Sequence, residues 1–312
     1  MSQQTKYAFL FPGQGAQSVG MGQELYQQSE QAKIIFDSID DSLGRSLTKI
    51  MFEGPEDELR ETINAQPAIM AVSLACLSTM KAELGDSFLS SPSMMAGHSL
   101  GEYSALAASG VLSVADASLL VQKRGELMQL ACDQNPGTMA AILGMDQDLI
   151  FEIAKSSGTY VSNINTQEQI VISGEKEKIQ IAMDMASEKG AKRVIPLNVG
   201  GAFHSGLMDP ARPGLEDAVE SVGFSDSSVP IVANCSAQPI SDSESIKKEL
   251  ITQISGCVNW KDTIQYMIDQ GVTDFYEIGP GRALSGMVKK INKEMNTFNI
   301  SDLVSIRELK TS

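Results

Sequence analysis

The sequence predicts an α/β fold: a parallel sheet covered by helices, with a small βαββαβ unit inserted into it. Short apolar runs at 6–11 and 93–96 each lead into a glycine-rich turn and then a helical pattern. Strand-turn-helix units of this kind favour a parallel sheet. Between about 137 and 199 the elements become shorter and follow a different order. At 312 residues the chain is long enough for about two domains of ~100 to 200 residues each.

The larger unit is expected to alternate strands and helices along most of the chain. Apolar periodicity and turn residues set the limits of each element. A helix is expected to begin after Ser113, whose side chain suits an N-cap. We expect strands at 6–11, 93–96, 229–235 and 274–278, and helices at 66–84, 113–132, 244–255 and 282–295.

The inserted unit has its own order of elements. We expect strands at 138–144, 159–165, 169–174 and 191–199, and helices at 147–158 and 175–190. The order β-α-β-β-α-β within about 60 residues is the ferredoxin-like arrangement. We therefore predict a catalytic core formed by 1–132 and 200–312, interrupted by a ferredoxin-like subdomain at 133–199.

Composition narrows the possible functions. No uncharged apolar run approaches the ~20 residues of a membrane span, and no basic region precedes the short N-terminal apolar run. We therefore expect a cytoplasmic protein without a membrane segment. The net charge of −15 disfavours nucleic-acid binding, which relies on neutralised phosphates. Cys76, Cys132, Cys235 and Cys257 lie far apart, so we expect buried free thiols and neither a metal site nor a disulfide framework.

A Gly-x-Ser-x-Gly frame from Gly97 to Gly101 is the first candidate for catalysis. With a strand before it and a helix after it, such a frame makes a sharp turn that exposes the serine hydroxyl at the helix N-terminus. The same turn directs backbone N–H groups, notably that of Leu100, at the oxygen of an attacked acyl group. Ser99 is therefore a candidate nucleophile, although the pattern also occurs in plain turns.

A serine nucleophile needs a general base, and the chain has two histidines. His98 adjoins Ser99 on the sharp turn, where neighbouring side chains project in different directions, so we interpret it as a structural or substrate-facing residue. His204 lies in a glycine-rich loop after the inserted unit and is the better candidate. A partly buried structural imidazole is the alternative. No aspartate can be assigned to orient it. Asp209 is close in sequence but is also suited to capping the next helix, and a backbone or side-chain carbonyl elsewhere is an equal candidate for the orienting acceptor.

Arg124 falls on the apolar stripe of the helix expected at 113–132. An unpaired buried guanidinium is costly, and its planar fork suits a carboxylate. Three interpretations remain open: an internal ion pair with an Asp or Glu, a side chain that reaches solvent along its stem, and a cavity that receives an acyl group with a terminal carboxylate. The stripe consists of Ala117, Leu120, Val121, Leu127, Met128 and Ala131.

The first turn has Gly13 and Gly15 but Ser18 where a dinucleotide-binding fingerprint requires a third glycine, so a dinucleotide site is not expected. We expect this turn to place the backbone N–H of Gln14 opposite that of Leu100, as a second donor to an oxyanion.

Six segments, in this order along nearly the whole chain, resemble the motifs of the malonyl-CoA:acyl carrier protein transacylase family. The ordered set is far more specific than any one motif. The resemblance implies an α/β-hydrolase-like core with a ferredoxin-like insertion, in agreement with the expected elements. The segments are "FPGQGAQ", "QPA" at 66–68, "GHSLGEYSAL", "KRGELMQ", "AFHSGLM" and "EIGPGRALSG".

The resemblance also implies roles for single residues. Ser99 corresponds to the family's nucleophile and His204 to its base. Arg124 corresponds to the arginine that pairs with the malonyl carboxylate. Gln14 and Leu100 correspond to the residues whose N–H groups bind the oxyanion.

Four further positions match the family with narrower implications. Gln253 matches the residue whose main-chain carbonyl orients the histidine, which would account for the missing aspartate. Asn165 matches an asparagine near the cleft, and His98 and Phe203 are expected to line that cleft. The residue identities at Leu100 and Phe203 resemble those of the family members that select malonyl over methylmalonyl groups.

Two segments depart from the family pattern. "NTQEQ" stands at 165–169 where the family has N-x-P-G-Q, and "VGGAFHS" at 199–205 has Ala202 in place of a proline. The first changes a loop at the edge of the inserted unit. The second loosens the backbone before His204.

The resemblance implies that the chain transfers malonyl from malonyl-CoA to the phosphopantetheine thiol of holo-acyl carrier protein, for fatty-acid synthesis, with no bound cofactor. Acyl carrier protein is the expected partner, and we expect a monomer. The alternatives are a discrete acyltransferase of a polyketide pathway, an acyl-thioester hydrolase, and an inactive carrier-binding module. Lysines at 289, 290 and 293 are a candidate docking patch, although a lysine-rich helix end is commonly just solvated.

Overall fold

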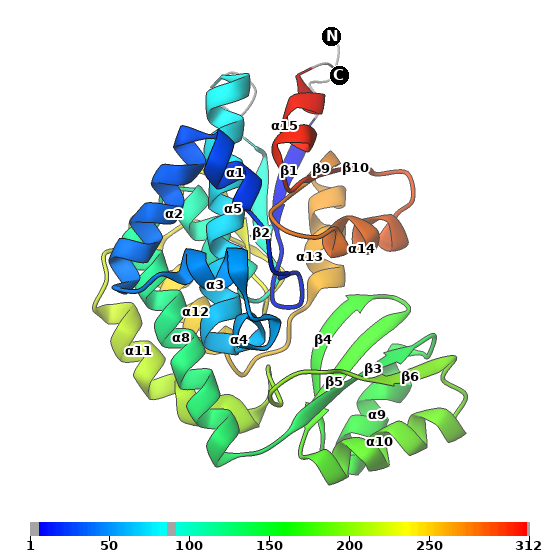
Figure 1. Ribbon diagram of the computed structural model, residues 1–312. Helices are drawn as coiled ribbons and strands as arrows, with labels where there is room; N and C mark the ends of the chain where they lie inside the picture. The colour runs from blue at the N-terminus through cyan, green and yellow to red at the C-terminus, as the bar shows by residue number, and fades with distance from the viewer. Residues whose placement is uncertain (1–5, 86–91, 311–312) are drawn as a thin grey trace.

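A six-stranded sheet forms the larger part of the molecule in the computed structural model, which describes residues 6–85 and 92–310 (Figure 1). The strand order is β10-β9-β1-β2-β7-β8, and every neighbouring pair is parallel except β7 with β8. The predicted parallel sheet is therefore confirmed. Its strands are β1 (Lys6–Phe11), β2 (Met94–Gly97), β7 (Ile231–Val232), β8 (Pro239–Ile240), β9 (Val272–Ile278) and β10 (Asn296–Ile300).

Helices cover both faces of this sheet. Alternate side chains of a strand point to opposite faces, and in β1 Phe9 and Phe11 enter one hydrophobic cluster while Ala8 and Leu10 enter another. The second cluster is covered by α13 (Trp260–Asp269) and α14 (Ala283–Ile291). The first contains residues of α1 (Gln23–Gln28), α2 (Glu30–Leu43), α3 (Leu47–Glu53), α4 (Glu56–Arg60), α5 (Thr62–Leu84), α7 (Gly101–Ala108), α8 (Val114–Gln134), the 3₁₀ helix η1 (Gly206–Ala211), α11 (Arg212–Glu220), α12 (Ser243–Gln253) and α15 (Leu303–Leu309).

Helix α5 is apolar on all sides and lies inside the protein. It is the one described helix long and apolar enough to cross a membrane, and 89% of its most apolar window is buried. Pro67 lies within it and has no N–H to donate to the carbonyl of Ile63. That carbonyl accepts a hydrogen bond from Arg45 Nη2 instead, at 3.2 Å.

A second, antiparallel sheet of four strands has the order β4-β5-β3-β6. Its elements follow the predicted βαββαβ order, and α9 and α10 cover one face of the sheet (Figure 1). The other face packs against the larger core through Met139, Ala141 and Val171. The division of the chain into two domains at 133 and 199 stays a prediction. The elements are β3 (Thr138–Leu143), α9 (Gln147–Ser157), β4 (Tyr160–Thr166), β5 (Gln169–Gly174), α10 (Lys176–Glu188) and β6 (Arg193–Pro196).

Several expected elements differ in length, and some elements of the structure were not predicted. The helix expected at 282–295 ends at Ile291, because Asn292 is extended and the polar turn after it leads into β10, which was not predicted. The strand expected at 229–235 is reduced to β7, since residues 234–236 form a turn that leads into β8. The four thiols are free, but Cys235 and Cys257 are partly exposed where burial was expected.

Candidate active site

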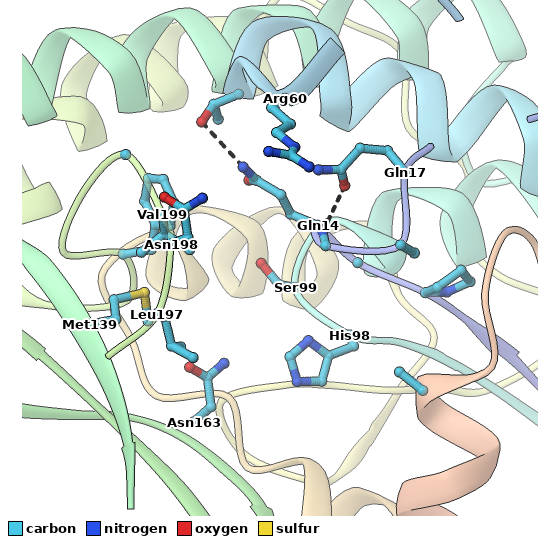
Figure 2. A pocket seen from close by; sticks show the side chains of 18 of the residues that line it. Gln14, Gln17, Arg60, His98, Ser99, Met139, Asn163, Leu197, Asn198 and Val199 are labelled. Atoms are coloured by element: carbon cyan, nitrogen blue, oxygen red, sulfur yellow. Dashed lines mark hydrogen bonds between the residues drawn. The ribbon is translucent and has the colours of Figure 1, made fainter. Parts of the chain in front are cut away.

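A cleft of about 1120 Å³ opens where several parallel strands end (Figure 2). The turns after β1, β2 and β9 contribute the segments 12–17, 98–99 and 281–284 to one wall. Met139 and Asn163 of the small sheet lie on the opposite wall. Ligands of open α/β sheets bind outside the carboxyl ends of the strands, and Figure 2 shows Ser99 in the middle of this lining.

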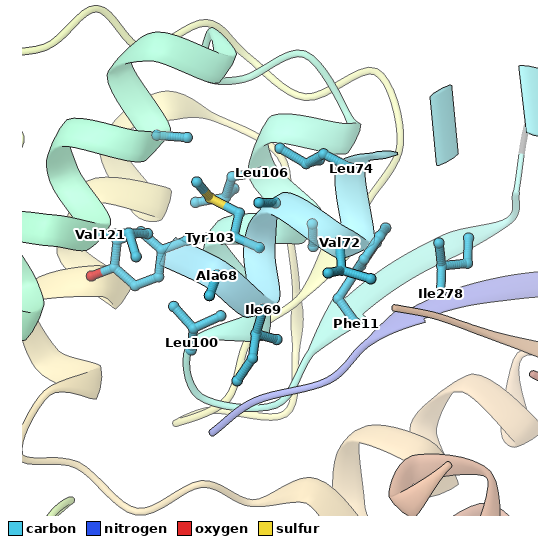
Figure 3. Packing of buried hydrophobic residues seen from close by; sticks show 14 of the residues in the cluster. Phe11, Ala68, Ile69, Val72, Leu74, Leu100, Tyr103, Leu106, Val121 and Ile278 are labelled. Carbon is cyan, nitrogen blue, oxygen red and sulfur yellow. The ribbon is translucent and has the colours of Figure 1, made fainter. Parts of the chain in front are cut away.

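The turn after β2 holds Ser99 in a left-handed conformation, with φ at 53°. The two glycines of the frame allow this turn because they lie against backbone. A Cβ atom on Gly97 would overlap the backbone of Gly101, and one on Gly101 would overlap the carbonyl of Phe11. Leu100, directly after Ser99, is fully buried and fixes the start of α7 in the hydrophobic core (Figure 3).

Ser99 and His204 form a direct hydrogen bond, with 2.8 Å between Ser99 Oγ and His204 Nε2. The other ring nitrogen, Nδ1, lies 2.9 Å from the carbonyl oxygen of Gln253 and 3.1 Å from that of Gly256. A carbonyl oxygen can only accept, so Nδ1 carries the proton and Nε2 presents a lone pair to the serine hydroxyl. The imidazole is thus in the form that a general base requires.

His204 is 4% exposed, and its φ is 55°. Burial, followed by the nearby Arg124 cation, lowers the pKa of His204 from 6.5 to about 3. The imidazole is therefore neutral at physiological pH. Ala202, which replaces the family's proline, is buried, and its carbonyl accepts the hydroxyl of Ser205 at 2.5 Å.

His98 points away from the serine hydroxyl, in agreement with the geometric expectation. Its Nε2 lies 2.9 Å from Asn165 Oδ1 on β4. The ring also packs edge-on against Trp260, with 5.3 Å between ring centroids. His98 and Asn165 therefore connect the two sheets beneath the cleft, and both line it.

Arg124 is 1% exposed and lies behind Ser99, outside the lining of the cleft. Its Nη2 donates to Ser99 Oγ at 3.2 Å and to Gln253 Oε1 at 2.9 Å, and its Nη1 donates to Gln66 Oε1 at 2.7 Å. No carboxylate of the described chain forms an ion pair with it. The direct hydrogen-bond partners of this buried cation are neutral oxygens, and the buried Glu102 carboxylate acts on it through space, so an anionic group beside Ser99 would be its first directly bonded counter-charge.

Two backbone N–H groups near Ser99 are free to bind an oxyanion. Gly13 has no side chain to separate the first turn from the carbonyl of His98, so the turn containing Gln14 lies close to the turn containing Leu100. Within residues 6–85 and 92–310, neither the Gln14 nor the Leu100 N–H donates to a protein acceptor. The side chain of Gln14 is held by Thr62 Oγ1 at 3.4 Å.

The structure brings the remaining predicted residues to the same region. Phe203 is 7% exposed and lines the cleft, and the carbonyl of Gln253 holds His204. Three polar residues that we had not predicted also belong to this region: Glu102, Gln66 and Asn234. A "QPA" tripeptide marks Gln66, but nothing in its spacing indicates a contact with Arg124.

Comparison with known proteins places the chain in a family. The acyl transferase domain family matches residues 8–310. The chain belongs to this family. A malonyl CoA-acyl carrier protein transacylase of Bacillus subtilis is 45% identical over 303 residues, which are 96% of this chain and 94% of that protein.

Solved structures of acyl transferases agree with this assignment. An acyl-carrier-protein S-malonyltransferase from Bartonella henselae has a TM-score of 0.95 at 40% identity, covering 98% of this chain and 99% of that one. A malonyl transacylase in complex with a holo acyl carrier protein of a type II polyketide synthase has a TM-score of 0.93 at 36% identity, covering 99% and 100%. The predicted resemblance and the predicted fold class are confirmed.

Proposed function

We propose that this acyl transferase moves a malonyl group from malonyl-CoA to the phosphopantetheine thiol of holo-acyl carrier protein through an ester on Ser99. One observation carries the proposal. The hydroxyl of Ser99 contacts a neutral imidazole at 2.8 Å and a buried guanidinium at 3.2 Å. A base and a cation at one hydroxyl suit a nucleophile whose acyl group carries a negative charge.

In the first half-reaction Ser99 Oγ attacks the thioester carbonyl while its proton passes to His204 Nε2. The hydrogen bond from Nδ1 to the Gln253 carbonyl stabilises the imidazolium. The free N–H groups of Gln14 and Leu100 receive the negative oxygen of the tetrahedral intermediate. The C–S bond then breaks, the coenzyme A thiolate takes the proton from His204, and the malonyl ester remains on Ser99.

In the second half-reaction the carrier thiol enters the same cleft and gives its proton to His204. The thiolate attacks the ester carbonyl, and the C–O bond to Ser99 breaks. The proton returns from His204 to Ser99 Oγ, which restores the enzyme. The sequence is a ping-pong exchange, in which coenzyme A leaves before the carrier reacts.

We propose that Arg124 selects malonyl by pairing with its free carboxylate. The guanidinium has only neutral hydrogen-bond acceptors in the described chain, and hydrogen bonds to a carboxylate are stronger than those to neutral oxygens. The carboxylate would replace the hydroxyl of Ser99 as a partner of Nη2 once that oxygen is esterified.

The partner proposal rests on the transacylase that was solved with a holo carrier of a polyketide synthase. We propose a carrier of fatty-acid synthesis for this chain, in the cytoplasm, with malonyl-CoA and the holo-carrier as its substrates and no bound cofactor. The polyketide alternative keeps the same chemistry. The expected monomer stays a prediction.

A transfer assay with purified proteins tests the proposal. Malonyl-CoA is mixed with holo-carrier and the enzyme, and malonyl-carrier is measured by intact mass. We expect transfer with the wild type and a loss of at least about 10³-fold with Ser99→Ala or His204→Ala. Free malonate without malonyl-carrier would instead support the hydrolase. Comparing a fatty-acid carrier with a polyketide carrier distinguishes the two pathways.

A further inference from the structure

Glu102 is a buried carboxylate directly behind the nucleophile. It lies on α7, three residues after Ser99, and is 1% exposed. No Lys or Arg of the described chain forms an ion pair with it. Its oxygens contact three donors from two residues, Asn234 and Gln253. Burying a carboxylate without a cationic partner costs free energy. Packing alone therefore does not explain why this acid is buried.

Asn234 connects Glu102 to the turn that carries Ser99. Its backbone N and its Nδ2 lie 2.9 and 3.0 Å from Glu102 Oε1. Its Oδ1 accepts the backbone N–H of Ser99 at 2.7 Å, and its Nδ2 also donates to the carbonyl of Gly97 at 2.7 Å. One side chain therefore holds both sides of the serine turn.

Gln253 connects Glu102 to the histidine and to the arginine. Its Nε2 donates to Glu102 Oε2 at 3.0 Å and to the carbonyl of Ser99 at 2.7 Å. Its Oε1 accepts Arg124 Nη2, and its main-chain carbonyl accepts His204 Nδ1. Any displacement of this residue moves the acceptor that orients the base.

The direction of each hydrogen bond in this network is fixed. Asn234 Oδ1 must face the N–H of Ser99, and Gln253 Oε1 must face the guanidinium of Arg124, since those groups only donate. Both amide NH₂ groups are thereby turned toward Glu102, which accepts all three bonds. Burial and the neighbouring Glu249 carboxylate raise the pKa of Glu102 well above 4.5, and the Asn234 and Gln253 donors and the Arg124 cation oppose the rise.

We propose that Glu102 is a positioning residue of the acyl transfer, which through Asn234 and Gln253 sets the serine turn and the His204 acceptor relative to each other. This inference rests on the function proposed above. A carboxylate can accept from both amides at once. A carboxamide at the same place would present an NH₂ group to one of them, and that amide would lose its partner.

The test is Glu102→Gln, which keeps the size of the side chain. Its matched control is Glu277→Gln on β9. Glu277 is fully buried and also accepts three donors, from Leu284 N, Ser285 N and Asn299 Nδ2, none of which contacts Ser99 or His204. Both variants are compared at equal folded concentration, with single-turnover acylation by malonyl-CoA and labelling of Ser99 by a fluorophosphonate.

We expect Glu102→Gln to lower the maximal single-turnover acylation rate by about 30-fold or more, as for an unpaired buried amide. The malonyl-CoA concentration that gives half of this rate should change less than about threefold. Glu277→Gln should lose thermal stability but keep its acylation rate. Equal rate losses in the two variants, or a wild-type rate in Glu102→Gln, would show that Glu102 is merely structural.

Two further measurements keep the inference testable. If Glu102→Gln does not fold, Glu102→Asp is tested instead, because it keeps the charge on a shorter side chain. We expect its acylation rate to fall about tenfold, and a wild-type rate would contradict the proposal. If the wild type is not acylated by malonyl-CoA, the proposed function fails. The fluorophosphonate then tests the network alone, because that reagent needs only an activated Ser99.

Discussion

Ser99 and His204 share an unusual backbone conformation as well as a hydrogen bond. Three non-glycine residues of the described chain have a positive φ, and two of them are this serine and this histidine. The third, Ala237, lies in the turn between β7 and β8. Strained backbone of this kind persists where surrounding structure determines it, commonly at functional sites. Here the buried Leu100 and the Asn234 side chain hold the serine turn.

Because the pKa of His204 is lowered, we expect the acylation rate to stay nearly constant as the pH falls below 7.5. With a pKa of about 3, the imidazole remains the unprotonated base down to pH 5.5. The single-turnover acylation rate should therefore change less than about twofold between pH 7.5 and 5.5. An ordinary pKa of about 6.5 would lower it about tenfold over the same interval, and that result would contradict the structure.

The same shift predicts a dependence of stability on pH. The unfolded state binds a proton at this histidine below about pH 6.5, whereas the native state remains neutral until about pH 3. The free energy of unfolding should therefore fall as the pH falls through this window, with about 2 kcal/mol lost between pH 7 and 5. Urea unfolding of His204→Gln, which lacks this proton uptake, should show a correspondingly smaller loss.

From the buried guanidinium of Arg124 beside Ser99 we expect the enzyme to select acyl groups that carry a free carboxylate. Arg124→Ala should lower the acylation rate with malonyl-CoA by about 100-fold, because two charge-assisted hydrogen bonds are lost. Acylation by acetyl-CoA should fall less than about tenfold. Lys123→Ala is the control, since this neighbouring cation is exposed and pairs with Glu126. Equal losses for the two acyl groups would mean that Arg124 only supports the turn.

At the scale of elements, the site depends on how closely α7 follows β2. Gly101, the first residue of α7, lies against the carbonyl of Phe11, the last residue of β1. This contact joins two adjacent parallel strands at their carboxyl ends. It places the first turn, with Gln14, next to the serine turn.

Gly101→Ala should therefore destabilise the protein by about 3 kcal/mol or more, because the added Cβ meets backbone that cannot yield. Gly286→Ala is the matched control. This glycine is also helical, in α14, and has open space around its Cα, so alanine should stabilise it by about 0.5 to 1 kcal/mol. Chemical unfolding of both variants checks the pair. A Gly101→Ala protein as stable as the wild type would contradict the close approach.

The elements that the sequence predicts well have strong local patterns. Helix α8 begins where Ser113 accepts the N–H of Asp116, and the βαββαβ order follows from alternation and turn residues. The candidate site residues were identified in the sequence through motifs and through the scarcity of histidine. The partners Glu102 and Asn234 were missed because they meet only in space, 132 residues apart. Nothing local in the sequence indicates that contact.

At the scale of the whole molecule, the cleft lies between the two sheets. The backbone of Ile164 on β4 donates to the carbonyl of Val258, and Val258 N donates to the carbonyl of Ser162, each at 2.9 Å. These bonds hold the edge of the small sheet beside the segment that leads into α13. Helix α14 packs against β4 as well, and Arg282 and Met287 bring it to the cleft.

This arrangement predicts where a carrier protein approaches. Lys289 and Lys290 are exposed in the last turn of α14, on the helix whose beginning lines the cleft. The double charge reversal to Glu should raise the KM for an acidic holo-carrier by about fivefold or more at low salt, with the KM for malonyl-CoA unchanged.

The control for this experiment is a reversal of the exposed Lys155 and Lys189, which lie at the ends of α9 and α10 on the outer face of the small sheet. This control changes the net charge equally. If both double variants shift the KM for the carrier alike, the effect is one of net charge and α14 is not the docking surface.

The most direct test of the catalytic role of Ser99 is the intact mass of the enzyme after incubation with malonyl-CoA alone. We expect one malonyl adduct on the wild type, located to Ser99 by peptide mapping and removed when holo-carrier is added. Ser99→Ala should gain no adduct. An unmodified wild type, or an adduct that persists in Ser99→Ala, would contradict the proposed malonyl-serine intermediate.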